Sequence, residues 1–82
     1  MNQHSFIIPL ILAEESKELC VYELKGGNFF RDKCMSQGIL PGHNIILVKK
    51  CIKGPYIINV RNTNIILSQN IVRKILVTNN DL

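Results

Sequence analysis

The pattern of apolar and polar positions along the chain is that of a β-rich protein. Short runs of branched aliphatic residues alternate loosely with polar ones, and each run ends near glycine, proline or asparagine. Runs of this kind are typical of half-buried strands. They predict strands over residues 19–25, 44–50, 56–60, 65–67 and 74–78. The apolar segment 1–13 contains Pro9 and is predicted to be an edge strand or an extended strap, and residues 79–82 a frayed tail.

One segment, residues 28–37, carries a helical pattern instead. Asn28 is a suitable N-cap, because its side-chain oxygen can accept from a free amide of the first turn. Phe30 and Cys34 lie four residues apart, with Met35 beside them, and form an apolar stripe at helical spacing. The sequence therefore predicts a single helix inserted after the first strand that follows Pro9.

The end of this helix is specified twice. Gly38 can adopt the left-handed conformation that terminates a helix, and Ile39 is placed to fold back against the last turn. Pro41 and Gly42 then supply the fixed φ and the permissive φ of a type II turn. These two devices define where the helix sits relative to the next strand.

Two further turn signals complete the predicted topology. Residues 61–64 read as a tight hairpin turn in which Asn62 or Asn64 tolerates a positive φ. Ser68 is a suitable cap for a single helical turn over residues 69–72. Short strands at this spacing predict a mainly β domain spanning residues 1–82, a five- to six-stranded, closed or nearly closed small barrel with one inserted helix.

Composition fits one small globular domain. The chain has 82 residues, of which 46% are apolar and 20% charged. No apolar run approaches the roughly 20 residues that cross a bilayer. No secretory signal is recognisable, and three cysteines without a CxxC pair argue for reduced thiols, so the chain is expected to be cytoplasmic.

Two stretches then carry a family resemblance: FRDKCMSQGILPGHNI over residues 30–45, and GPYIINVRNTNIILSQNIVRKILV over residues 54–77. Together they resemble the FeoA family, the small SH3-like proteins of bacterial ferrous-iron uptake. The resemblance covers about residues 9–77 and implies an SH3-like barrel. The matching positions are Arg31, Cys34, Gln37, Gly38, Ile39, Pro41, Gly42, Gly54, Pro55, Ile65, Leu67, Ile75 and Val77.

The chain departs from the family pattern at three positions. Cys34 and Gln37 stand where the family usually has leucine, and Asn62 where it often has glycine. Cysteine behaves as a small buried hydrophobe, whereas a buried amide needs hydrogen-bond partners, so Gln37 is expected to face solvent. These departures leave room for a divergent partner surface.

The resemblance implies a cytoplasmic accessory protein that binds and modulates the FeoB-type Fe(II) permease and its GTP-binding domain. Phe29 and Phe30 are adjacent on the helix, so they cannot both face the core, and one of them is expected to be an exposed anchor. The predicted partner-binding residues lie on the helix and the loop after it: Phe29, Phe30, Arg31, Lys33, Ile39 and Leu40.

No metal, cofactor or catalytic site is predicted. The residues that could ligate a metal are His4, His43, Cys20, Cys34, Cys51, Glu14, Glu15 and Glu18, and none has a ligand spacing. The cysteines are interpreted as structural or inert, and His43 as a turn residue with at most a weak or transient Fe(II) contact. Gly26 and Gly27 lack the lysine and hydroxyl of a phosphate loop, and the protein is expected not to be an enzyme.

Two alternatives stay open. Lys49, Lys50 and Lys53 could form the rim of a nucleic-acid-binding barrel, although only two tyrosines are available for stacking. The chain is also similar to the metal-responsive domain appended to iron-dependent repressors. Short exposed barrel edges would allow weak homo-oligomerisation.

Overall fold

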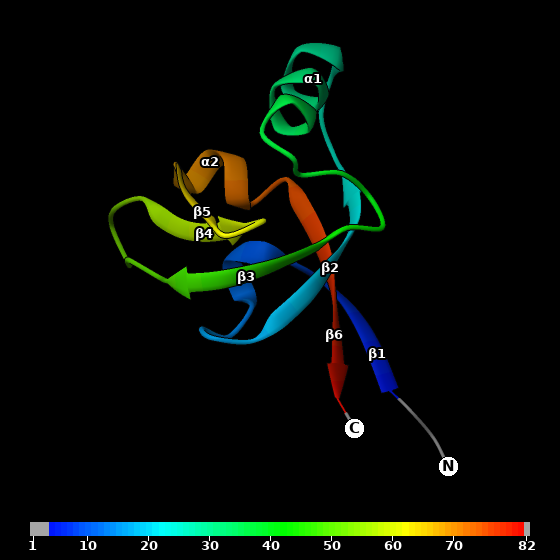
Figure 1. Ribbon diagram of the computed structural model, residues 1–82, viewed down its shortest axis with the longest axis vertical. Helices are drawn as coiled ribbons and strands as arrows, with labels where there is room; N and C mark the ends of the chain where they lie inside the picture. The colour runs from blue at the N-terminus through cyan, green and yellow to red at the C-terminus, as the bar shows by residue number, and fades with distance from the viewer. Residues whose placement is uncertain (1–3, 82) are drawn as a thin grey trace.

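Six antiparallel strands form one curled sheet in the order β1-β6-β2-β3-β4-β5 (Figure 1). The structure is a computed structural model that describes residues 4–81. Its strands are β1 (His4–Pro9), β2 (Glu18–Leu24), β3 (Asn44–Lys49), β4 (Tyr56–Val60), β5 (Thr63–Leu67) and β6 (Ile75–Asp81). A 3-10 turn η1 (Leu10–Leu12), a helix α1 (Asn28–Ser36) and a short helix α2 (Gln69–Val72) complete it. The predicted mainly β class with one inserted helix and a single helical turn is confirmed.

The core follows from the alternation of inward and outward residues along the strands, which is clearest in β3 and β4. In β4, Tyr56, Ile58 and Val60 point inward, and in β3, Ile45 and Leu47 do so. Among the residues whose burial the structure describes, the sixteen buried side chains are hydrophobic and make one cluster: Leu10, Ala13, Leu19, Val21, Leu24, Cys34, Ile39, Ile45, Leu47, Tyr56, Ile58, Val60, Leu67, Val72, Ile75 and Val77. Register shifts in β2 and β3 bend the sheet around this cluster.

The exit of α1 is built as predicted. Gly38 has φ +89°, its amide donates to Met35, and the amide of Ile39 donates to the carbonyl of Cys34. This is the paired hydrogen-bond pattern of a Schellman motif. The following turn has Gly42 at φ +91°, with the His43 amide donating to the Leu40 carbonyl over 3.0 Å, as a type II turn requires.

Two local predictions were wrong, and a third was right only in part. Gly27 is the N-cap of α1 and no side chain caps the helix, so Asn28 is already helical. The hairpin turn has a positive φ at Asn62, one of the two positions predicted to tolerate it, and also at Arg61, whereas Asn64 lies inside β5. Residues 79–81 are not a frayed tail, because β6 continues to Asp81 and pairs with β1 along its length. A strand needs only a partner in register, and β1 supplies one here.

The two ends of the molecule differ in construction (Figure 1). Strands β1 and β6 run together as a ribbon whose free end carries both chain ends. Helix α1 stands at the opposite end, beyond the curled sheet and next to α2. The predicted strand segment before His4, together with Leu82, lies outside the described residues.

Candidate interaction site

Helix α1 is attached to the sheet through one side only. Cys34 is its single buried residue, and Phe30 packs against the core from the first turn. The ring of Phe30 lies directly over Gly26, where any Cβ would collide with it. The ammonium of Lys74 lies 5.6 Å from the centre of the same ring, within the range of a cation–π contact. Phe30 is therefore the aromatic that positions the helix.

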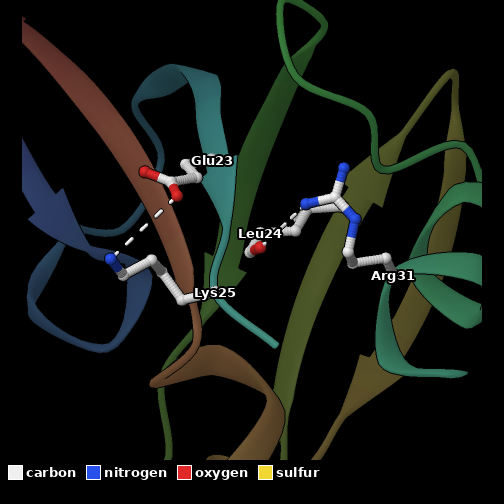
Figure 2. Close-up of polar contacts among 4 residues, drawn as sticks. All are labelled: Glu23, Leu24, Lys25 and Arg31. Carbon is white, nitrogen blue, oxygen red and sulfur yellow. Dashed lines mark hydrogen bonds and ion pairs between the residues drawn. The ribbon is translucent and has the colours of Figure 1, made fainter. Parts of the chain in front are cut away.

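Arg31 is a second tether between the helix and the sheet. Its Nη1 donates to the carbonyl of Leu24, the last residue of β2, over 3.3 Å (Figure 2). On either side of Leu24, Lys25 and Glu23 form an ion pair of 4.0 Å. Arg31 is half-buried, so part of its hydrogen-bonding capacity serves the fold.

The outward face of α1 has a different composition. Phe29 is 82% exposed, although it adjoins Phe30 in sequence. Lys33 and Gln37 follow at four-residue intervals and are also exposed. Residues four apart lie on the same face of a helix, so these three side chains form one continuous surface.

This face borders a groove between α1 and the β5–α2 segment, which we name the α1–α2 groove. Its volume is about 220 Å³. Its lining is mainly apolar and consists of Phe29, Phe30, Lys33, Cys34, Gln37, Leu67, Ile71 and Lys74. The hollow continues over Ile66, which is 69% exposed. An apolar side chain from a partner could lose its hydration here without any change in the body of the barrel.

The predicted partner-binding residues are distributed unevenly over this site. Phe29 and Lys33 are exposed, while Phe30, Arg31 and Leu40 are half-buried. Ile39 has no exposed surface at all, so its side chain is not available to a partner and that part of the prediction is wrong. The same fold-back contact that ends the helix turns Ile39 into the core.

Sequence reasoning missed the opposite wall of the groove. Leu67, Ile71 and Lys74 come from β5, from α2 and from the residue before β6. In sequence they lie about thirty residues or more from α1, and no pattern within either segment indicates the contact. The outward position of Ile66 could have been noticed from the alternation of β5, since Leu67 points inward.

The three thiols differ in burial. Cys34 is buried, Cys20 is half-buried and Cys51 is exposed. His43 is exposed in the type II turn. Among the described residues, no group of three histidine, cysteine or acidic side chains is close enough to hold a metal ion. Burial raises the pKa of the Cys34 thiol above its ordinary value, which keeps this groove-lining group protonated at neutral pH.

One of the two tyrosines is not available to stack a base beside the basic loop near Lys49. Tyr56 is buried, and its hydroxyl donates to the carbonyl of Ile11 over 3.3 Å. Tyr22 is 51% exposed but lies on β2. A strand face on which bases could stack needs exposed aromatics beside the basic residues, and Tyr56 does not provide one.

Comparison with known proteins identifies the family of this barrel. The FeoA domain model matches residues 8–79, which is most of the chain. The chain belongs to the FeoA family. This membership implies a role in ferrous-iron uptake. None of the curated proteins compared with the chain matches it in sequence.

Two solved structures show the same FeoA fold. A crystal structure of an iron uptake regulatory protein, FeoA, superposes with a TM-score of 0.82 at 25% identity, covering 88% of this chain and 96% of the other. The NMR structure of a FeoA-like protein from Clostridium acetobutylicum gives a TM-score of 0.75 at 25% identity, covering 87% and 84%. Within residues 4–81 of the present FeoA chain, no helix has both the length and the apolar content to cross a membrane.

Proposed function

We propose that this FeoA chain is a cytoplasmic accessory protein that binds the FeoB-type ferrous-iron permease at its GTP-binding domain and modulates it. In this proposal the protein acts by binding, performs no reaction, and reaches the inner membrane only through its partner. The outer face of α1, with Phe29 and Lys33, makes the contact, and the rigid barrel positions that face.

The observation that carries the proposal is the contrast between two adjacent phenylalanines. Phe30 is held over Gly26 and packs on the core, whereas Phe29 is 82% exposed beside an apolar groove. Exposing a phenylalanine to water is unfavourable, and large aromatics are the residues that most often dominate binding energy at interfaces. Since Phe30 already anchors the helix, Phe29 is not needed to hold α1 in place.

A titration of the purified FeoB cytoplasmic domain with this protein tests the proposal. We expect Phe29→Ala to weaken binding by about thirtyfold or more, because truncating an anchor aromatic costs an interface roughly 2 kcal/mol or more. Lys33→Glu should weaken it further, since it reverses a charge on the same face. The measurement is the dissociation constant, with circular dichroism to show that the fold is intact.

Tyr22→Ala is the matched control. It also removes an exposed aromatic, but from β2, outside α1 and its groove. Arg31 is a poor test residue, because its bond to Leu24 makes any substitution partly structural. If Phe29→Ala and Lys33→Glu bind the permease domain as tightly as Tyr22→Ala does, the proposed surface is wrong.

A further inference from the structure

The α1–α2 groove combines an apolar floor with a basic rim. The floor is made by Cys34, Leu67 and Ile71, and Phe29 forms one border. Lys33 from α1 and Lys74 from the other wall stand at the edges. The two lysines come from opposite sides of the groove, so a bound segment would pass between two ammonium groups.

Neither ammonium forms an ion pair with a described residue, although that of Lys74 also lies over the ring of Phe30. The ion pairs of the described residues join Lys17 to Glu14 and Lys25 to Glu23, and neither involves Lys33 or Lys74. No acidic residue lines the groove or its extension over Ile66. The lysine stems can cover apolar surface while their charged ends stay in water, where a carboxylate could meet them.

The polar part of the groove lining has unused hydrogen-bonding capacity. The side-chain amide of Gln37 lines the groove and makes no hydrogen bond within the described part of the chain, although its backbone amide caps the helix. A carboxamide at this position can donate to a carbonyl and accept from an amide of an extended segment. Leucine, the usual family residue here, could do neither.

From these three features we infer that the groove binds a short acidic-apolar segment: one or two large aliphatic side chains with carboxylates on both sides. The aliphatic groups occupy the floor, the carboxylates meet Lys33 and Lys74, and Gln37 holds a peptide group between them. Complementary charge sets the orientation of the segment and raises its association rate more than its affinity. This inference rests on the proposed function, since the segment would belong to the cytoplasmic part of the permease.

The test uses a defined probe and the full chain. The probe is a blocked nine-residue peptide with two leucines between two glutamates and glycine-serine flanks, and its match has glutamines in place of the glutamates. Binding is followed by amide chemical shifts of the isotope-labelled protein. We expect the acidic peptide to shift amides of α1, β5 and α2, and to bind about fivefold or more tightly than the glutamine peptide at low salt. Because the lysines are exposed, this preference should shrink once the Debye length falls to about 3 Å in about 1 M salt.

Two double variants with equal net charge make the comparison specific. Lys33→Gln with Lys74→Gln should abolish the preference for the acidic peptide. Lys49→Gln with Lys53→Gln removes the same charge from the β3–β4 region and should leave the preference intact. Because Lys74 also contacts Phe30, its replacement could disturb the helix. The single variant Lys33→Gln avoids this and should lose part of the preference for the acidic peptide.

Several outcomes would overturn the inference. These are shifts that map outside the groove, equal affinity for the two peptides, or equal effects of the two double variants. If amide chemical shifts of the groove change with protein concentration in the absence of peptide, a second copy of the chain is the occupant. This outcome also overturns the inference.

Parallel titration with the permease domain separates the two proposals. If the domain binds and loses affinity with Phe29→Ala and Lys33→Glu but does not compete with the peptide, the proposed function stands and this inference falls. If the peptide binds as expected but the domain does not bind, the chemistry of the groove stands and the choice of permease as partner falls.

Discussion

The curled sheet and helix α1 are stabilised in different ways. In the sheet, each central strand pairs on both sides, and inward residues such as Leu47 and Ile58 have no exposed surface. In α1, one residue is buried, and attachment depends on Phe30, Cys34 and the bond from Arg31 to Leu24. The sheet therefore determines the stability of the protein, whereas α1 presents a surface at low cost to that stability. Substitutions in the two regions should differ accordingly.

The largest effect is expected in the sheet. Leu47→Ala should lower the free energy of unfolding by about 3 kcal/mol, because it removes buried methyl groups and leaves a cavity in a close-packed core. Ile46, the neighbouring outward residue of the same strand, is 36% exposed. Its replacement by alanine should lower the free energy of unfolding by about 1 kcal/mol or less. Urea denaturation of both variants measures the difference. Equal losses would mean that the inward and outward faces of β3 have been misassigned.

An intermediate effect is expected at the attachment of α1. Phe30→Ala should cost about 2 kcal/mol, since the ring is partly buried between the helix and the sheet. Phe29→Ala should change stability by less than about 0.5 kcal/mol, because its ring is mostly in water already. The pair is compared by thermal and urea unfolding. A Phe29→Ala variant as unstable as Phe30→Ala would show that both rings hold the helix, and the proposed division of roles would fail.

The smallest effect is a pH dependence from Cys34. Burial raises its pKa in the folded state above the unfolded value of 9.0, so the folded protein holds this proton more tightly. Its contribution to stability is fully present below pH 9.0 and is lost as the pH rises through the folded pKa. Urea midpoints measured from pH 7 upward should fall less steeply above pH 9 for Cys34→Ala than for the unchanged protein.

Cys51→Ala serves as the control for that series. Cys51 is exposed, and its replacement should leave the alkaline fall unchanged. An alkaline fall that survives Cys34→Ala in full would show that Cys34 is not its source. The same samples can be treated with a thiol reagent, which should modify Cys51 well before Cys34.

Much of the fold could be predicted because its signals are local. The exit of α1 was predicted residue by residue. Gly38 and Gly42 each adopt a positive φ, and the hydrogen bonds that fix these conformations are made by residues only a few positions away. The strands β3 and β4 were predicted to within one residue from alternation. Predictions that depended on a distant partner were poorer. Residues 79–81 pair with β1, but the composition of neither segment indicates this pairing.

The candidate site divides in the same way. Adjacent residues on a helix point about 100° apart, so the sequence by itself determined that one of Phe29 and Phe30 must leave the core. Only the tertiary structure decided which one, because the choice depends on the space above Gly26 and on Lys74 reaching the ring from a distant segment. The groove likewise exists only where α1 meets the β5–α2 segment. Local hydrogen bonding and periodicity are encoded within a few residues, whereas a surface shared by distant segments forms only when the chain is packed.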